Sequence, residues 1–264
     1  MPRTDLEIQG ERALVTAAGR GIGREIAARL AGTGVNVAIN DIDAEAAESA
    51  VEGLGTDGGE VIAAPGDVSE EATATEIVET TVEAFDGLDI LVNNVGVAGP
   101  RKPAEEISGA EFMETLSVNL GGIFNPTRAA IPHLKGSAAG RVVNVSSKSA
   151  KLPRTNRTPY SASKMGIIGF TRALALELAD HDVTANTVCP GTVSGDRLDR
   201  VMEMRAKNTG VALEEVEREF RESSPLGVLT EAGDIADMVL FLCSSRADHV
   251  VGQDLNVSAG RIMF

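Results

Sequence analysis

Short apolar runs of strand length alternate with longer amphipathic segments along the chain. The apolar runs lie at 13–16, 35–40, 61–64, 90–93, 141–146, 183–188 and 254–257. Segments with helical periodicity lie between them, at 23–30, 70–85, 123–134, 164–179 and 232–243. Because parallel strands need crossover helices, the alternation predicts a parallel sheet covered on both faces. Seven such strands predict an α/β, doubly wound Rossmann-type fold with a seven-stranded parallel sheet.

The length of 264 residues suits one α/β domain, and the sequence contains no internal repeat or low-complexity linker. We therefore expect a single domain over 1–264, with an insert at about 192–229 that covers the substrate and is helical at 213–220. No apolar stretch reaches the ~20 residues of a membrane span, and Met1 to Asp5 lacks the hydrophobic region of a signal peptide. These features predict a soluble, cytoplasmic protein without a membrane partner.

The charge balance excludes a nucleic-acid partner, since the formal net charge is −15, from 39 acidic and 24 basic residues. Only 6 of the basic residues are Lys, and an acidic, Lys-poor surface resembles proteins from salt-loving organisms. An ordinary acidic cytosolic enzyme is the alternative. Cys189 and Cys243 have no metal-ligand or redox spacing, so we expect two buried thiols. The three histidines are far apart in sequence, and no metal site is predicted.

A glycine-rich turn directly follows the first apolar run and directly precedes a helical segment. Glycines in such a turn let the backbone approach a pyrophosphate, whose charge is then held by the helix N-terminus. Asp41 ends the second apolar run, where an acid can accept hydrogen bonds from an adenosine ribose. A helix-capping turn is the alternative interpretation. Together these positions predict a dinucleotide site whose first contacts are Thr16, Gly19, Arg20, Gly21, Ile22, Gly23 and Asp41.

Tyr160 is the only tyrosine in the chain, and Lys164 follows it at a helical i, i+4 spacing. On a helix these two side chains share one face, so the ammonium group stands beside the phenol. A neighbouring cation favours the phenolate and lowers the pKa of a tyrosine from its usual value near ~10. The pair is therefore a candidate general acid/base, although an ordinary tyrosine packed on a helix would have the same spacing.

These features together resemble the short-chain dehydrogenase/reductase family over nearly the whole chain. The family's first motif, Thr-Gly-x-x-x-Gly-x-Gly, is matched at Thr16, Gly21 and Gly23, with Ala17 in place of its first glycine. Gly195 replaces a threonine that the family often has after its Pro-Gly motif. The resemblance implies further cofactor contacts at Asp67, Val68, Asn94, Gly96, Tyr160, Lys164, Pro190, Gly191 and Val193.

The resemblance also implies a catalytic set of Asn119, Ser147, Tyr160 and Lys164. Ser147 stands thirteen residues before Tyr160, a spacing that favours it over the adjacent Ser146 as the substrate-binding serine. In family terms Asn119 holds a water for proton relay, Tyr160 exchanges the proton, and Lys164 binds the nicotinamide ribose. Asp41 predicts NAD over NADP, because its carboxylate would face the 2′-phosphate, although Arg20 in the turn argues for NADP.

Three stretches, at 97–103, 148–159 and 192–229, are expected to form the substrate pocket. The second carries Lys148, Lys151, Arg154 and Arg157, which either recognise an anionic substrate or are solvated loop charges. The first substrate class is a small polar alcohol or its carbonyl, including sugars and polyols. A 3-oxoacyl carrier-protein reductase is the nearest rival, and a non-catalytic NAD-binding regulator is the rival of another class. Family members are usually tetramers or dimers, so a homo-oligomer is expected, with contacts from the 167–178 helix face or from 260–264.

Overall fold

The computed structural model describes residues 6–54 and 58–264, so the expectation that Met1 to Asp5 forms no hydrophobic leader lies outside it. Its central feature is a sheet of seven parallel strands in the order β3-β2-β1-β4-β5-β6-β7. This confirms the predicted α/β, Rossmann-type fold. The strands are β1 (Arg12–Val15), β2 (Asn36–Ile39), β3 (Val61–Ala63), β4 (Ile90–Asn93), β5 (Arg141–Val145), β6 (Thr184–Pro190) and β7 (Asp254–Val257).

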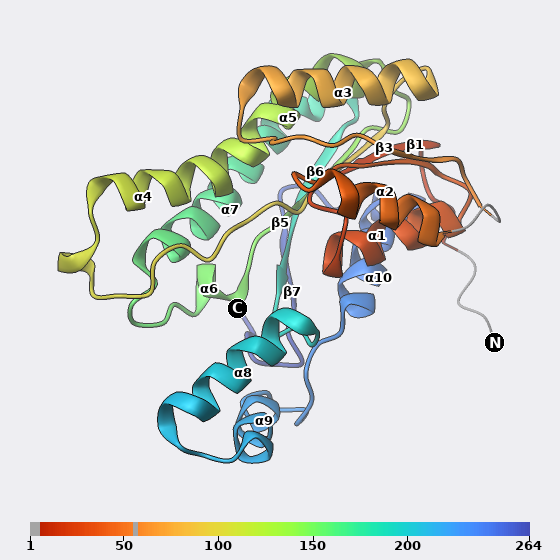
Figure 1. Ribbon diagram of the computed structural model, residues 1–264. Helices are drawn as coiled ribbons and strands as arrows, with labels where there is room; N and C mark the ends of the chain where they lie inside the picture. Colours follow the sequence, from red (N-terminus) through yellow and green to blue (C-terminus); the bar gives the residue numbers. More distant parts are fainter. Residues whose placement is uncertain (1–5, 55–57) are drawn as a thin grey trace.

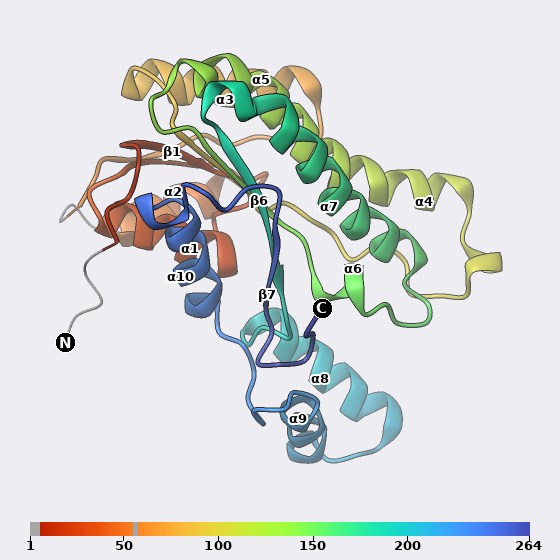
Figure 2. The same ribbon diagram turned by 180° about the vertical axis from the view of Figure 1, so that it is seen from behind.

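Helices cover both faces of the sheet and make three layers (Figures 1 and 2). On one face, α1 (Gly21–Gly32), α2 (Ala44–Leu54) and α10 (Ala232–Leu242) bury side chains such as Ile26, Leu30 and Ile235 against the strands. On the other face lie α3 (Glu71–Phe85), α5 (Gly122–Gly136) and α7 (Thr158–Leu178). Apolar strands that are buried on both sides are what a parallel sheet requires.

Four further helices of the described residues lie around the carboxyl ends of the strands. α4 (Gly109–Leu116) continues into a π-helical turn, η2 (Ser117–Gly121), and the short α6 (Lys148–Lys151) follows β5. α8 (Asp196–Thr209) and α9 (Leu213–Glu222) lie below the sheet in Figure 1 and share a small apolar core of Leu198, Met202 and Val216. The helix predicted at 213–220 is confirmed. Single 3-10 turns complete the fold, η1 (Ala104–Glu106), η3 (Ala179–His181) and η4 (Ser245–Ala247).

The helix that carries the Tyr-Lys pair begins at Thr158, earlier than the predicted 164, and Pro159 occupies its first turn. Proline suits this position because the first helical amides have no intrahelical acceptor. Tyr160 and Lys164 therefore both lie on α7. Ile167, Leu174 and Leu178 are buried in the core, so this face does not provide the subunit contacts that were considered for it. Met263 and Phe264, at the other candidate contact, are exposed.

The strand order reverses between β1 and β4, since the chain runs outward from β1 in both directions. Loops that leave the carboxyl ends of two such strands turn to opposite faces and leave a crevice between them, which is where open α/β sheets bind ligands. In this chain Thr16 follows β1, Asn94 follows β4 and Ser146 follows β5. The fold thus brings the predicted site residues to one edge of the sheet.

Ala17, which replaces the family's first glycine, has a left-handed backbone with φ of 48°. Alanine in this region is strained by about 1 kcal/mol relative to glycine. We expect Ala17→Gly to raise the free energy of unfolding by up to about 1 kcal/mol, measured by urea denaturation. Ala18→Gly is the matched control, because Ala18 is buried outside the left-handed region and should lose stability. Equal losses in both variants would contradict the assignment of strain to Ala17.

Candidate active site

Hydrogen bonds join the turn after β1 to the end of β4. Thr16 Oγ1 accepts from the Asn94 amide at 3.0 Å, and Asn94 Nδ2 donates to the Ala17 carbonyl at 3.0 Å. A Cβ built on Gly23 would lie only 2.4 Å from the Ala17 carbonyl oxygen, so α1 packs directly against the turn. Thr16, through its hydrogen bond to Asn94, and Gly23, through its close packing on Ala17, therefore determine the shape of the turn.

The N-terminus of α1 is open toward solvent. Its N-cap residue, Arg20, makes no side-chain capping hydrogen bond, and a Cβ built on Gly21 would meet no atom within 4 Å. The first amides of a helix lack intrahelical acceptors and carry its positive dipole end. These residues therefore fit the pyrophosphate of a dinucleotide, which would bind these amides without a capping side chain in the way.

Asp41, at the end of β2, lies against the same turn. Its Oδ2 accepts from the Gly19 amide at 3.0 Å and its Oδ1 from the Asp43 amide at 3.1 Å. Arg20 Nη2 pairs with Asp43 Oδ2 at 2.6 Å on the surface. The arginine that argued for NADP thus has an acidic partner, a feature that Asp43 beside Asp41 could have indicated in the sequence.

One large cleft of about 990 Å³ opens along this edge of the sheet. Its walls come from the turn after β1, from the loops after β4, β5 and β6, and from the start of α7. Of the predicted contacts it is lined by Arg20, Gly21, Ile22, Asn94, Gly96, Ser147, Tyr160, Lys164, Pro190, Gly191 and Val193. Such a volume is within the usual range for small-molecule and cofactor sites.

The other predicted residues lie behind or beside this cleft. Asp67 Oδ1 accepts from the amide and the hydroxyl of Ser69, at 2.9 and 2.7 Å, and so shapes the loop after β3. Val68 is buried, and its carbonyl accepts from Asn125 Nδ2 on α5 at 3.3 Å. Neither side chain lines the cleft.

Tyr160, Lys164 and Ser147 meet in the cleft wall. Lys164 is 4% exposed, and its Nζ donates to the Val145 carbonyl at 3.1 Å. Ser146 Oγ donates to the Lys164 carbonyl at 2.7 Å and so fastens α7 to the end of β5. Ser147 accepts from the Ser149 amide and is the hydrogen-bonding neighbour of Tyr160. The two adjacent serines therefore have different contacts, with Ser146 bound to the backbone of α7 and Ser147 beside the Tyr160 side chain.

The charges around Tyr160 favour its ionised form. Burial alone would raise the pKa of the phenol, but the Lys164 ammonium, the Ser147 hydroxyl and the guanidinium groups of Arg197 and Arg157 lower it below its usual value. Burial also lowers the pKa of Lys164, and the attraction of Tyr160 opposes this. Arg157 lies over the Tyr160 ring, with its guanidinium carbon 4.4 Å from the centroid. A phenol with a lowered pKa in a cleft is suited to proton transfer.

Asn119 lies in the π-helical turn and is fully buried. Its Oδ1 accepts from the Val97 amide at 2.7 Å, and its Nδ2 donates to the Val97 carbonyl at 3.1 Å and to Ser163 Oγ at 2.9 Å. The side chain thus connects the loop after β4 to α7, one turn from Tyr160. Insertions of this kind in helices are frequent at functional sites. Both side-chain groups of Asn119 already make hydrogen bonds within the protein, so a water held by this residue would have to bind to its backbone.

The cleft has the opposite charge from the chain as a whole. Eight of its lining side chains are Lys or Arg, and one, Asp196, is acidic. The sequence grouped Lys148, Lys151, Arg154 and Arg157 as one basic cluster, but Lys151 pairs with Asp254 and does not line the cleft. The stretches at 97–103 and 192–229, which were also predicted to form the pocket, add Arg101, Arg197 and Arg200, residues that the sequence did not single out.

Two further properties concern the described ranges, 6–54 and 58–264. Within them, no group of His, Cys, Asp and Glu side chains is arranged to hold a metal ion. No helix there is both long and apolar enough to cross a membrane.

Cys189 and Cys243 are buried free thiols, as expected, and burial raises their pKa values to about 11 and about 12. These thiols are therefore poor nucleophiles at neutral pH.

The fold and the cleft define a nucleotide-dependent oxidoreductase, and comparison with known proteins gives its family. Residues 11–206 match the family described as short chain dehydrogenase, and the chain belongs to that family. It is an NAD(P)-dependent oxidoreductase of hydroxyl and carbonyl groups.

Individual relatives match along nearly their whole length. A subunit of a hydroxy(phenyl)methylsuccinyl-CoA dehydrogenase from Thauera aromatica is 38% identical, over 97% of this chain and 98% of its own. A D-beta-hydroxybutyrate dehydrogenase from Cupriavidus necator is 35% identical, over 96% and 98%. The crystal structure of a 3-ketoacyl-(acyl-carrier-protein) reductase from Brucella melitensis, complexed with NADH, has a TM-score of 0.84 and 33% identity, over 97% and 99% of the two chains.

Proposed function

We propose that this protein is an NAD-dependent dehydrogenase that interconverts a small polar secondary alcohol and its ketone. The observation that carries the proposal is the position of Tyr160, between the buried Lys164 and Ser147 in the wall of the cleft. The relatives described above are named for a hydroxyacyl thioester, a hydroxy acid and a ketoacyl thioester, which all contain such a group. A panel of secondary alcohols, hydroxy acids, polyols and sugars, followed by NADH absorbance, tests it.

The residues of the wall divide the chemistry between them. The substrate hydroxyl lies between Ser147 Oγ and Tyr160 Oη, and the ionised phenol takes its proton during oxidation. Lys164 stabilises the phenolate and binds the nicotinamide ribose. The nicotinamide supplies the hydride acceptor for oxidation and the hydride donor for reduction. Asn119 positions α7 and the loop after β4 rather than touching substrate.

The cleft would hold the cofactor between the turn after β1 and the loop after β6. The first amides of α1, at Gly21, Ile22 and Gly23, would bind the pyrophosphate, with Arg20 at the rim. Asp41 would accept from the adenosine ribose, while Asp67 and Val68 would shape the adenine side through the loop after β3. Asn94 and Gly96 line the middle of the cleft, and Pro190, Gly191 and Val193 line the nicotinamide end.

NAD is the preferred cofactor, because the Asp41 carboxylate would face the 2′-phosphate of NADP without a compensating charge. The pairing of Arg20 with Asp43 supports this, since the Arg20 guanidinium is already directed to an acid. We expect kcat/KM with NAD to exceed that with NADP at least tenfold, about 1.4 kcal/mol. Asp41→Ser should lower this ratio about tenfold. Asp43→Asn should lower it less, because an exposed ion pair is weak. Equal efficiencies in the unmodified protein would contradict the role of Asp41.

The whole of 1–264 acts as one dinucleotide-binding and catalytic domain, and the segment at about 192–229 covers the substrate. α8 and α9 support the second part of this proposal, since Leu198, Val201 and Phe220 line the cleft. Their separate small core allows the pair to shift as a unit against the sheet.

A 3-oxoacyl carrier-protein reductase is the second candidate, and one comparison favours it. The Brucella protein carries the name of such a reductase and was crystallised with NADH, so a preference for NAD does not exclude this activity. An acetoacetyl thioester tested both free and on a carrier protein separates the candidates. A large gain from the carrier would favour the reductase. A cofactor-bound protein inactive on all substrates would instead favour the NAD-binding regulator.

The residues on the surface bear on the oligomeric state of the protein, its location in the cell and its adaptation to salt. A homo-oligomer, tetrameric or dimeric, is supported by exposed apolar side chains on the α4, α5 and α7 side of the sheet, namely Met113, Phe124, Met165 and Leu176. A cytoplasmic enzyme adapted to high salt is supported by the net charge of −15 and by the scarcity of lysine. Sedimentation and activity at low and molar salt test these two points.

A further inference from the structure

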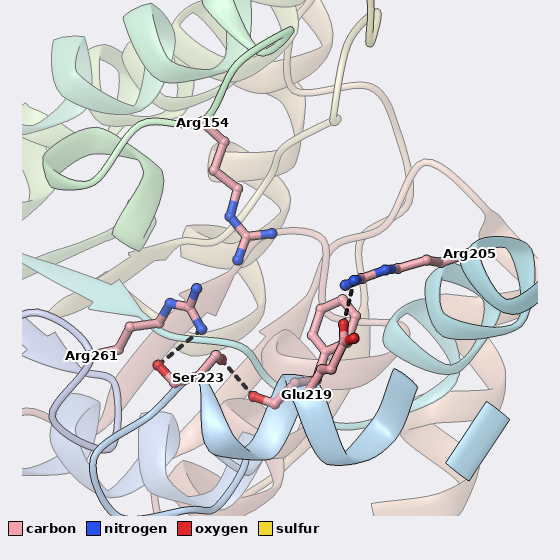
Figure 3. A pocket seen from close by; sticks show the side chains of 6 residues that line it. Arg154, Arg205, Glu219, Ser223 and Arg261 are labelled. Carbon is pink, nitrogen blue, oxygen red and sulfur yellow. Dashed lines mark hydrogen bonds and ion pairs between the residues drawn. The ribbon is translucent and has the colours of Figure 1, made fainter. Parts of the chain in front are cut away.

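A small cavity of about 120 Å³ opens beside the large cleft, with which it shares Arg154 and Phe220 (Figure 3). Arg154 comes from the loop between α6 and α7, and Arg261 comes from the segment after β7. Figure 3 shows the two guanidinium groups directed toward the same space. Lys148, which follows Ser147 in the cleft wall, adds a third cation close to both. We call Lys148, Arg154 and Arg261 the basic corner.

No carboxylate of the described residues pairs with the basic corner. Glu219 lines the small cavity, but it is paired with Arg205 from α8. Lys148 donates to the Thr192 hydroxyl, and Arg261 Nη1 donates to the Ser223 carbonyl at 3.2 Å. Arg261 Nε is buried and has no hydrogen-bond partner. In a chain with 39 acidic residues, three cations without an acidic partner among the described residues suit an anionic ligand.

The three cations repel one another at close range. Burial and the nearby Arg261 and Arg154 lower the pKa of Lys148 to about 7. Burial and Arg154 also lower the pKa of Arg261. Holding like charges together costs free energy unless an anion neutralises them. Loss of the Lys148 proton or a bound anion would each relieve this repulsion, and the buried Arg261 Nε without a hydrogen-bond partner favours the anion.

We propose that the substrate carries an anionic group, a carboxylate or a phosphate, and that the basic corner binds this group while its hydroxyl lies between Ser147 and Tyr160. This inference rests on the proposed function, because it names the substrate class of the same cleft. It replaces the neutral sugar or polyol as the first choice of substrate. Planar guanidinium groups such as Arg154 and Arg261 suit the paired oxygens of either anion.

Two other sources of negative charge must be distinguished from a group on the substrate. The pyrophosphate of the cofactor would bind at the N-terminus of α1, at the other end of the cleft lining. An acidic carrier protein could reach Arg154, which is exposed, but Lys148 and Arg261 are partly buried and the cavity of about 120 Å³ has room only for a small group. The corner lies instead on the Ser147 side of the cleft, where a substituent of the substrate would extend.

Matched substrate pairs test the proposal by turnover. One arm compares 3-hydroxybutyrate with its methyl ester, and the other compares glycerol 1-phosphate with glycerol, each with saturating NAD. We expect kcat/KM to be at least tenfold higher for the charged member of one pair, equivalent to about 1.4 kcal/mol. The favoured arm identifies the anion as carboxylate or phosphate. Equal or better turnover of both neutral members would overturn the inference and leave the proposed function standing.

Charge-neutralising variants locate the anion. Arg154→Gln should lower the charged-to-neutral selectivity about tenfold, mainly through KM of the charged substrate. Arg246→Gln is the matched control, because Arg246 is exposed on η4 and lines neither cavity. A rise in the KM of NAD in Arg154→Gln, with the selectivity unchanged, would assign the arginine to the cofactor and overturn the inference.

Binding without turnover separates this inference from the proposed function. Calorimetry of the NADH-saturated protein should detect succinate or inorganic phosphate, but not dimethyl succinate, and Arg154→Gln should weaken the anion at least tenfold. Anion binding at the corner without oxidation of any alcohol would support the inference and contradict the proposed dehydrogenase. Absence of binding by either anion, together with equal turnover of charged and neutral alcohols, would contradict the inference alone.

Discussion

Tyr160→Phe is expected to lower kcat by about 10²–10⁴-fold, the usual contribution of general acid-base catalysis. The variant keeps the aromatic ring, so its packing against Arg157 and the wall of the cleft should remain. It removes only the hydroxyl that exchanges the proton beside Ser147. Steady-state turnover of the best substrate from the panel, with NADH affinity measured by fluorescence, gives the two quantities.

The expected pattern is a large loss of kcat with NADH affinity nearly unchanged. Ser161→Ala is the matched control, because it removes a neighbouring hydroxyl of α7 that is buried without a hydrogen-bond partner. Its turnover should equal that of the unmodified protein. Turnover retained within a few-fold in Tyr160→Phe would remove the phenol from the chemistry.

Lys164→Met should produce the second large loss, because methionine fills a similar volume without the charge. In the oxidation direction the phenolate is the active form, so the rate rises with pH through the pKa of Tyr160. Lys164 is the largest influence that lowers this pKa, ahead of Ser147, Arg197 and Arg157. Its removal should move the rising limb of the kcat profile to higher pH and reduce kcat at neutral pH about 10²-fold or more.

Stability distinguishes this effect from misfolding. Lys164 is 4% exposed and burial lowers its pKa, so the ammonium costs free energy in the fold. The pKa of Lys164 is lower in the folded state than the unfolded value near 10.5. Protonation of Lys164 below pH 10.5 therefore favours the unfolded state and lowers the free energy of unfolding. We therefore expect thermal stability at neutral pH to be no lower in Lys164→Met. Lys135→Met, on the exposed end of α5, is the control. An unchanged pH profile would contradict the role of Lys164.

The sequence predicted the sheet because the five inner strands, β1, β2, β4, β5 and β6, are mostly buried on both faces and form apolar runs, which are a strong signal. The edge strands β3 and β7 are only partly buried. The sequence also brought Tyr160 and Lys164 together, since one helical turn fixes their relation whatever the rest of the chain does. α2 was missed although it is amphipathic, because its buried residues, Ala46, Ala47 and Ala50, are all alanines and the apolar face contains no larger side chain there. α4 could have been found from its capping box, in which Ser108 precedes Glu111 by three residues.

Other properties of the site depend on tertiary structure and have no local pattern. Arg154 and Arg261 are more than a hundred residues apart, and only the return of the chain after β7 places them at one cavity. The left-handed backbone of Ala17 could not be predicted from the residue type, because alanine disfavours this conformation.

The order of the strands also fixes the length of ligand that the cleft can use. β1, β4, β5 and β6 are consecutive neighbours in the sheet. Because neighbouring strands are about 4.8 Å apart, Ser147 after β5 lies about 10 Å across the sheet from the turn after β1, and the end of β6 lies about 15 Å across it. A ligand whose pyrophosphate binds the α1 amides therefore needs a further group that extends about 10–15 Å across the sheet to reach the reacting wall. In a dinucleotide the second nucleotide half is that group, so the spacing of the strands matches the two halves of the cofactor.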